Sequence, residues 1–527
     1  MVFRRVWLYA FLLSIIFALA GCSTTAGSRK GSDFHLDLTA KGTEGFVVLK
    51  VVATRPISLL NPKWQSIRVQ GSVTGAALEM DDITPIYNML GGKHVPTESL
   101  YFAKLPAGNY DVTSLGSIGP GPGLMLALLM SDRQVTTSKL PQFQVVPGAL
   151  ANLGTMVFSP EYEKELQSKL VLLGGDIGKS AALEDLLAEA DLSDLPLGQA
   201  GGWLEFKPND ESALVDARNL VSMLSLRTDG LSGAVSAGSQ MGQMFEKSAK
   251  SEWTGETIGT LTTIRATARL ADGTLLAGGD YGRYYIKMPG AQWKSSRVAR
   301  EKGRVVHIEP RDDGTVLFFL GDLRQTRMVV KKALSDPSEQ LVPSLVMEAP
   351  PDNLMVVDND IVFAWNEPGF TRKSHFARID KQTLQIKKTM EPFWVIDWQK
   401  TSASEVLLTR MNGMSTYRST SIDALHTWKH TEMTLPFGPR WIDSSEGYAL
   451  DISPGFRMVK NTLKRTSDGG QTWVRLGTPL ETEHFAGRIV SASSGELLVQ
   501  GSNMLFSTRD QGNTWQRVFP RSQTPAR

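Results

Sequence analysis

The chain of 527 residues is poor in cysteine: Cys22 is the only one, so no disulfide can form within one molecule. Its seven histidines are scattered without the spacing of metal ligands, and the sequence therefore predicts no metal site and no cofactor. An excess of charge of one sign is absent too, because 56 Lys and Arg residues stand against 54 Asp and Glu residues. This balance gives no general electrostatic attraction for nucleic acid.

Long apolar runs are missing after residue 21. Near the N-terminus, Arg4 and Arg5 precede an apolar run from Val6 to Leu19. The run is shorter than the roughly 20 residues of a membrane-spanning helix and has the length of the apolar region of an export signal. We therefore predict a cleaved signal peptide over residues 1–21.

The residues at the end of this signal, Leu19-Ala20-Gly21-Cys22, resemble the lipobox of bacterial lipoproteins. The resemblance implies cleavage before Cys22 and a lipid on its sulfur; a signal peptide with a chance cysteine is the alternative. Ser23 follows, and not the aspartate that retains lipoproteins in the inner membrane in enterobacterial-type sorting, so we expect anchorage in the outer membrane of the cell envelope. Residues 22–32 are small, polar and basic, and are predicted to form a flexible tether.

Residues 33–159 show apolar residues at every second position, interrupted by Gly/Pro turns, which predicts a β domain. The turn Leu105-Pro106-Ala107-Gly108-Asn109-Tyr110 resembles a hairpin of transthyretin-like and carboxypeptidase-regulatory-like domains. That resemblance implies a β-sandwich. Residues 160–250 differ, because apolar residues recur at helical spacing in 181–190 and 210–224, with Gly/Ser-rich stretches at 198–202 and 230–242. We expect a helical connector over 160–250.

Three segments near the C-terminus share a hydroxyl residue, an aspartate, a second hydroxyl residue and a tryptophan at constant spacing. They resemble the Asp-box turns of sialidase-type repeats, which implies structural turns and not reactive groups. The residues concerned are Ser421, Asp423, Thr427 and Trp428; Thr466, Asp468, Gly470, Thr472 and Trp473; and Thr508, Asp510, Gly512, Thr514 and Trp515. In the first segment Leu425 stands where the other two have glycine.

The spacing of these turns predicts the fold of residues 251–527. The tryptophans lie 45 and 42 residues apart, and Trp293 ends an eroded copy three periods of 45 before Trp428. A period of roughly 40–50 residues made of short strands indicates a β-propeller. Six apolar strands precede the successive repeats: 275–279, 316–319, 361–364, 406–408, 447–450 and 497–499. We therefore predict a mainly β protein with a six-bladed propeller, or a seven-bladed one if residues 203–208 or those around Trp253 add a blade.

The sequence gives little support for catalysis. The F/Y-R-I-P signature of sialidases is absent, and Arg265 and Arg269, in the corresponding region, are not followed by that proline. We therefore expect a binding or assembly scaffold and no enzyme. The alternative is a glycan-binding or sialidase-like propeller, for which Trp365, Trp394 and Trp398 are candidate sugar platforms.

A second resemblance concerns the partner. Asp-box propellers resemble a family of photosystem assembly factors, whose propeller binds a polypeptide through an arginine-rich face. Basic residues cluster between the first two predicted blades and are our candidates for such a surface: Arg297, Arg300, Lys302, Arg304 and Arg311. The partners we expect are the membrane, through Cys22, and an envelope protein or glycan.

Overall fold

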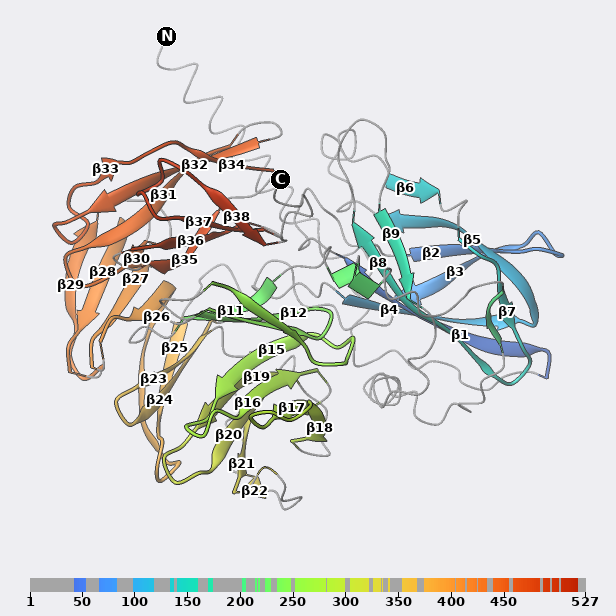
Figure 1. Cartoon of the computed structure of the whole chain (residues 1–527), viewed down its shortest axis with the longest axis horizontal. Coiled ribbons are helices and arrows are strands. Elements are labelled where there is room, and N and C mark those ends of the chain that lie inside the picture. The colour runs from blue at the N-terminus through green and yellow to red at the C-terminus, as the bar shows by residue number, and fades with distance from the viewer. Residues whose placement is uncertain are drawn as a thin grey trace, which may run out of the picture. The chain divides into compact units, whose positions relative to one another are not determined.

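A computed structural model gives the fold. The residues that the structure describes are 42–53, 66–82, 98–117, 133–136, 140–159, 169–173, 201–204, 214–215, 217–218, 223–228, 235–247, 252–280, 282–298, 304–321, 326–332, 334, 340–341, 353–366, 374–402, 404–412, 415–423, 425–433, 439–454, 458–483, 487–492, 495–501 and 504–519. The predicted signal peptide 1–21, Cys22 and the tether 22–32 lie outside them. The chain divides into two compact units, whose boundary in the sequence lies between residues 217 and 218 (Figure 1). In the described part of the chain, no helix has the length and apolar character needed to cross a membrane.

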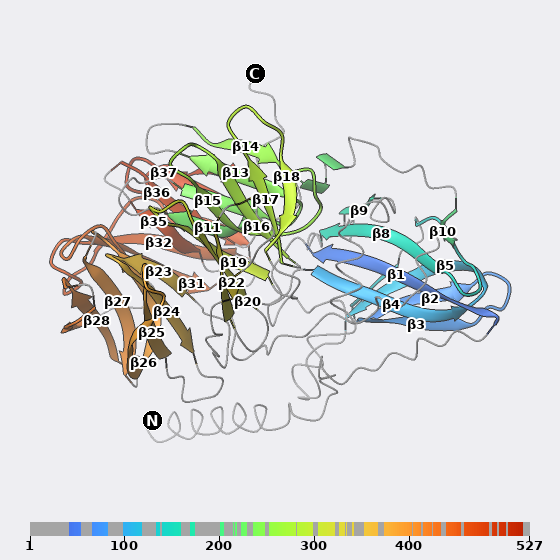
Figure 2. The same cartoon turned by 90° about the horizontal axis from the view of Figure 1, so that it is seen from below.

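The first unit is built from one continuous sheet that folds over on itself. The strand order is β10-β7-β5-β2-β3-β4-β1-β8-β9, with β6 paired to β5. Strands β3 and β4 pair at only two positions, and β7 contacts β1 and β8, so the sheet turns there into two layers (Figure 2). The bounds are β1 Glu44–Ala53, β2 Ser66–Gly71, β3 Ala77–Asp82, β4 Glu98–Pro106, β5 Gly108–Ser117, β6 Arg133–Thr136, β7 Phe143–Val145, β8 Leu150–Ser159, β9 Lys169–Leu173 and β10 Gly201–Trp203. The predicted β-sandwich is confirmed.

The turn between β4 and β5 shows why its sequence is special. Gly108 has a φ of 156°, in a region that favours glycine. Tyr110, two residues on, is buried, and its hydroxyl donates to the carbonyl oxygen of Pro106 at 2.7 Å. Its ring stacks on Phe143 with centroids 5.5 Å apart. The tyrosine therefore ties the hairpin to the core of the sandwich.

The second unit consists of small antiparallel sheets that follow one another along the chain (Figure 1). Seven blades are present among the described residues, because β26 belongs to two of them: its first part pairs with β25 and its second part with β27. The bounds for the first four blades are β11 Met223–Thr228, β12 Val235–Ser239, β13 Gln243–Lys247, β14 Thr254–Thr257; β15 Ile264–Arg269, β16 Leu275–Gly279, β17 Arg283–Lys287, β18 Lys294–Arg297; β19 Arg304–Pro310, β20 Val316–Gly321, β21 Thr326–Lys331, β22 Gln340–Leu341; and β23 Asn353–Val357, β24 Asp360–Asn366, β25 Ser374–Asp380, β26 Ile386–Lys400.

The last three blades continue the same pattern. The bounds are β27 Val406–Asn412, β28 Ser415–Ser421, β29 Lys429–Met433; β30 Arg440–Trp441, β31 Gly447–Pro454, β32 Met458–Thr466, β33 Val474–Arg475, β34 Leu480–Glu483; and β35 Arg488–Ala492, β36 Leu497–Gln500, β37 Leu505–Thr508, β38 Gln516–Phe519. All six strands predicted before the repeats are second strands of these sheets, β16, β20, β24, β27, β31 and β36. The propeller is confirmed, with the seven blades of the second alternative.

The ring closes by side-chain contacts between its first and last blades. First strands of neighbouring blades contact one another, as β11 and β15 do, and β11 also contacts β35. Val235 and Trp253 of the first blade share a core cluster with Leu498 of the last. Lys247 pairs with Glu496 across the same seam. Each of these two blades is one contiguous stretch of chain, so in the described residues no strand is exchanged at the closure.

The predicted helical connector over 160–250 is wrong for most of the residues that the structure describes there. In its first half, Lys169–Leu173 (β9) and Gly201–Trp203 (β10) are strands of the first unit's sheet, and the helical pattern over 181–190 lies outside the described residues. Residues 223–247 form β11, β12 and β13 of the first blade, and only 214–215 and 217–218 are described as helical. A Gly/Ser-rich stretch is typical of a linker, but here Gly238 and Gly242 serve close packing. A Cβ on Gly238 would lie 2.2 Å from the carbonyl oxygen of Ile264 in the second blade. A small residue is therefore required where β12 meets β15.

Candidate functional site

The repeated turns lie between the third and fourth strands of the last three blades. In the turn that follows β32, Asp468 Oδ1 accepts hydrogen bonds from the backbone N–H groups of Gln471 and Thr472, at 3.0 and 2.9 Å. The Thr472 hydroxyl donates to Oδ2 at 2.5 Å, and the Thr466 hydroxyl donates to Oδ1 at 2.8 Å. Thr466 Oγ1 in turn accepts the N–H of Gly470 at 2.9 Å. One carboxylate thus organises the whole turn.

The same bonds recur around Asp423 and Asp510. Each accepts from the hydroxyl and the N–H of the threonine four residues on, Thr427 or Thr514, at distances between 2.6 and 2.9 Å. These bonds, led by the one from the threonine hydroxyl, lower the pKa of Asp510 to about 2 and hold the pKa values of Asp423 and Asp468 well below the usual range. A carboxyl group with such a pKa stays ionised and is a poor proton donor at neutral pH.

The turn after β28 differs from the other two by its leucine. Leu425 has a φ of 74°, close to the 93° of Gly470 and the 86° of Gly512. A leucine in this region is strained, but its side chain is fully buried in the cluster that contains Val406 and Leu408. Burial of the apolar side chain offsets the strained backbone.

The tryptophan at the end of each turn is a packing residue. Trp428, Trp473 and Trp515 each stand directly before the fourth strand, and so do Trp253 and Trp293 in the first two blades, where the turn motif is missing or eroded. Trp473 donates from its indole nitrogen to its own turn, while Trp515 donates to the carbonyl oxygen of Thr478 in the preceding blade at 3.0 Å. The tryptophan is thus retained in blades where the aspartate is not.

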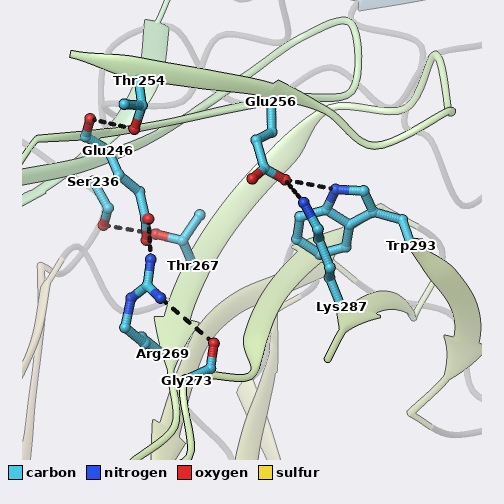
Figure 3. Close-up of polar contacts among 9 residues, drawn as sticks. All are labelled: Ser236, Glu246, Thr254, Glu256, Thr267, Arg269, Gly273, Lys287 and Trp293. Carbon is cyan, nitrogen blue, oxygen red and sulfur yellow. Dashed lines mark hydrogen bonds and ion pairs between the residues drawn. The ribbon is translucent and has the colours of Figure 1, made fainter. Parts of the chain in front are cut away.

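Polar contacts join the first blade to the second, as Figure 3 shows. Trp293 and Lys287 of the second blade both reach Glu256 of the first, at 3.2 and 2.6 Å. Arg269 pairs with Glu246 across the same seam. Arg269, which lies in the region where sialidases carry their F/Y-R-I-P signature, therefore contributes to blade packing.

The structure describes three residues of the predicted basic cluster, Arg297, Arg304 and Arg311. Arg300 and Lys302 lie outside the described residues, and Arg297 is on β18 in register with Arg283. Arg304 begins β19 and Arg311 follows its end, so their backbones are about 20 Å apart at a rise of 3.3 Å per residue. Arg311 pairs with Asp313 at 3.2 Å and donates to the carbonyl oxygen of Gln382 at 3.1 Å. Arg304 and Arg311 therefore lie at opposite ends of β19 and do not share one patch.

The candidate sugar platforms are described only in part. Trp398 is buried, and its ring lies edge-on to Phe376 at 5.5 Å, so it belongs to the core. The side chains of Trp365 and Trp394 are outside the described part of the structure. No group of three His, Cys, Asp or Glu residues in the described segments is placed to hold a metal ion.

Arginines gather at the starts of the inner strands, a feature that the sequence analysis missed. In a ring of four-stranded blades the inner strands run in the same direction, so their starts lie at one end of the central channel. At the second and third blades, Asp280 lies between Arg265, at 2.6 Å, and Arg304, at 3.5 Å. All three side chains are largely buried, with exposed fractions of 5%, 21% and 18%. This first arginine cluster, Arg265–Asp280–Arg304, is closed.

The second arginine cluster, Asp397–Arg440–Arg488, comes from the fifth, sixth and seventh blades. Arg488 donates to Asp397 Oδ1 at 3.2 Å, across two blades and 91 residues of sequence. Burial lowers the pKa of Arg440, an effect that the charge of Asp397 opposes and the charge of Arg488 reinforces. The Asp397 side chain is 9% exposed and that of Arg488 is 55% exposed. This cluster is open to solvent on the Arg488 side.

The sequence contains one signal for these clusters, which is the position of each arginine at the start of an inner strand. Arg304 and Arg440 are the first residues of β19 and β30, and Arg488 is the first residue of β35. Basic residues that recur at the blade period mark these positions. The sequence analysis instead grouped basic residues that are close in the sequence, and so it combined Arg304 and Arg311, which lie at opposite ends of β19.

Comparison with known proteins does not assign this chain to a family. No protein-family model matches this sequence, and no curated protein matches it in sequence. The chain is similar in structure to an ulvan lyase of polysaccharide lyase family PL25 bound to a sugar, with 10% identity, a TM-score of 0.37, and coverage of 57% of this chain and 96% of that one. It is also similar to YCF48 bound to D1 peptide (12% identity, TM-score 0.37, 54% and 92% covered) and to the WD40 β-propeller domain of Doa1 (13%, 0.33, 54% and 90%).

Proposed function

We propose that this chain is a lipid-anchored protein of the cell envelope, located in the outer membrane. We further propose that its propeller acts as a scaffold that binds a partner protein and catalyses no reaction. The observation that carries the proposal is the contrast between the polar groups of the propeller. The carboxylates of the turn aspartates accept hydrogen bonds within their own turns, whereas Arg488, at the start of an inner strand, is more than half exposed. The exposed charge is available to a partner.

The chemistry of the turns supports a structural role for them. In the canonical mechanism a glycosidase needs two carboxyl groups, one of which is protonated at the working pH; sialidases, whose nucleophile is a tyrosine, are an exception. Asp423, Asp468 and Asp510 have lowered pKa values and lie in separate blades, each engaged by its own turn. They do not supply such a pair.

The anchor in this proposal is the lipid on Cys22. Each buried CH₂ of an acyl chain contributes about 0.8 kcal/mol, so several chains hold a protein firmly on a membrane. The test is fractionation of cells that express the wild-type chain or Cys22→Ser. We expect the wild type in the outer-membrane fraction and the variant in the soluble fraction; a variant that still sediments completely with membranes would contradict the lipid anchor.

The scaffold role is tested by capture of the full chain, tagged at its C-terminus and cross-linked in cells before solubilisation. We expect one envelope protein to be enriched reproducibly over a sample without cross-linker. The same purified chain is assayed with a fluorogenic sialoside and with a mixture of acidic polysaccharides. Turnover of either substrate, in the absence of a captured protein, would replace the scaffold with the glycan-directed alternative.

A further inference from the structure

Three large apolar side chains of the second unit are exposed among the described residues. Met288 is 58% exposed, Ile422 is 71% exposed and Val474 is 63% exposed. Each lies at the turn between the third and the fourth strand of its blade: Met288 directly after β17, Ile422 directly after β28, and Val474 as the first residue of β33. In the described part of the propeller, exposure of large apolar side chains is thus confined to one kind of turn.

The turns between third and fourth strands all lie at one end of the ring. Neighbouring strands of a blade are antiparallel, so the third strand runs in the same direction as the inner strand and ends where the inner strand ends. Arg488, at the start of an inner strand, is at the opposite end. We call the end that carries Met288, Ile422 and Val474 the turn end.

The folding of the turns does not explain these apolar residues. In the eroded copy of the repeat, Met288 stands five residues before Trp293, in the place that the aspartate has in the complete copies. Its exposed thioether replaces a carboxylate that would organise the turn. Ile422 stands between Ser421 and Asp423, whose side chains bond one another at 2.8 Å, and it contributes no hydrogen bond to that network. The exposed apolar surface is therefore available to a partner.

The position of the three residues round the ring fits a flat partner. Met288 belongs to the second blade, whereas Ile422 and Val474 belong to the fifth and sixth, so the three side chains do not form one continuous patch. A compact protein contacts a continuous patch, but a bilayer surface meets all the turns of one end at once. The lipid proposed on Cys22 holds the chain beside a bilayer and raises the local concentration of lipid, so weak insertion of single side chains suffices.

We propose that the turn end of the propeller lies on the membrane surface, with Met288, Ile422 and Val474 inserted at the level of the lipid headgroups. The inference rests on the lipid anchor of the proposed function and adds the orientation of the propeller. When the turn end lies on the bilayer, the opposite end, where Arg488 is exposed, faces away from the bilayer and stays accessible.

The charge at the turn end is mixed. Arg509, which has the position of Ile422 in the last blade, is 62% exposed. The carboxylates of Asp468 and Asp510 lie in the same kind of turn and carry the opposite charge. Such a mixture gives no strong attraction for anionic lipids, so the contact depends on the apolar side chains. We therefore expect it on neutral phosphatidylcholine vesicles, at high salt as well as at low salt.

The experiment uses the lipidated full chain in phosphatidylcholine vesicles. Because Cys22 is the only cysteine and its sulfur carries the lipid, a cysteine introduced elsewhere can be labelled alone. A fluorophore is attached at Ser467→Cys, which has the position of Ile422 in the sixth blade, or at Arg488→Cys, at the opposite end. Nitroxide-labelled lipid headgroups then quench the probes. We expect the probe at position 467 to be quenched several times more strongly than the probe at position 488.

Matched variants test which side chains make the contact. Ile422→Asp and Val474→Asp change exposed positions, so we expect the unfolding temperature of the double variant to stay as in the wild type. Each change weakens the contact about tenfold, so quenching of the probe at position 467 falls to the level seen at position 488. Val73→Asp, at a 92% exposed position of the first unit, is the control and leaves the quenching unchanged.

Flotation of the chain with the vesicles tests the anchor, and quenching tests the contact, so the two proposals fail separately. Equal quenching of the two probes on a chain that floats would overturn the orientation and leave the anchor intact. Quenching that requires anionic lipid, or that is lost at high salt, would overturn the apolar contact. A probe at position 467 that responds to protein concentration and not to nitroxide lipid would make the covering surface a second copy of this chain.

Discussion

The first and last blades reach the same four-stranded form by different local means. The last blade has a complete turn, in which Thr508 and Asp510 bond the backbone up to Thr514. The first blade has no such turn, and is held to the second by Gly238 and Gly242 at close contacts and by ion pairs (Figure 3). The difference teaches that a blade is specified by its strand pattern and its packing against a neighbour, and that the turn motif is one of several ways to close the outer hairpin.

The largest expected effect comes from the first blade. Gly242 has a φ of 66°, and a Cβ there would lie 2.0 Å from the carbonyl oxygen of Thr260. Gly242→Val should therefore lower the free energy of unfolding by roughly 3 kcal/mol or more, through the clash and the strained φ together. Urea unfolding measures it, and Gly259→Ala, with a similar φ but open space around it, is the control. A Gly242→Val protein as stable as the control would mean that the blade does not need this contact.

Acid should weaken a seam that ion pairs hold. Glu309 in the third blade lies 2.8 Å from Lys381 of the fourth and 3.4 Å from His307. Burial alone would raise the pKa of Glu309, but His307 and Lys381 lower it from 4.5 to about 2. Because the folded pKa is below the unfolded one, the stabilisation is present above about pH 4.5 and is lost as the pH falls from there toward 2, by up to about 3 kcal/mol.

The measurement is the unfolding temperature between pH 7 and pH 3 for the wild type and Glu309→Gln. The variant should be less stable at pH 7, and its stability should fall less steeply with acid than that of the wild type. The turn aspartates titrate in the same direction in both proteins and so cancel in the difference. Parallel curves would show that Glu309 does not stabilise the seam.

In the turn after β28, the backbone strain at Leu425 can be compared with the stabilisation from burial of its side chain. Leu425→Gly removes a fully buried side chain and relaxes the strain of the positive φ. Because the lost burial is the larger of the two effects, we expect the free energy of unfolding to fall by about 2 kcal/mol. Leu425→Ala keeps the strained φ and should be less stable than Leu425→Gly by about 0.5–1 kcal/mol. Chemical denaturation of the three proteins gives both values. The reverse order of alanine and glycine would exclude backbone strain at this position.

The smallest expected effect is in the last blade. Thr508→Val keeps the shape of a buried side chain and removes the hydroxyl that accepts the N–H of Gly512 at 2.8 Å. We expect the free energy of unfolding to fall by about 1–2 kcal/mol, because the buried N–H of Gly512 is left without a hydrogen-bond partner. Thr508→Ser retains the hydroxyl and should lose less. A valine variant as stable as the wild type would mean that the turn forms from its tryptophan and aspartate alone.

The propeller could be predicted from the sequence because the residues that indicate it recur at a constant period. Trp428, Trp473 and Trp515 recur at the length of one blade, and the apolar second strands recur with them. The first blade was predicted only as an alternative, from Trp253. Glycine and serine are typical both of linkers and of strands in close contact, and the packing of Gly238 on Ile264 distinguishes the two. β26 was also missed as a shared strand, because no turn separates its two halves.

The candidate site was less predictable than the fold. The aspartates of the turns act on residues within four positions of themselves, so their contacts follow from the sequence. Asp397 and Arg488 are 91 residues apart and meet only because the ring curves round on itself. A local search of the chain cannot find a cluster of that kind; it requires the number of blades and the register of each inner strand.

The closure of the ring by side chains, with Lys247 on Glu496 and Trp253 against Leu498, has a consequence for the order of folding and for the number of blades. Because each blade occupies one uninterrupted stretch, a blade can pair its strands as soon as that stretch has been synthesised, without waiting for the C-terminus. For the same reason, duplication or deletion of one stretch of about 40 residues would change the circumference of the toroid and leave the remaining sheets intact, except at the fourth and fifth blades, which share β26.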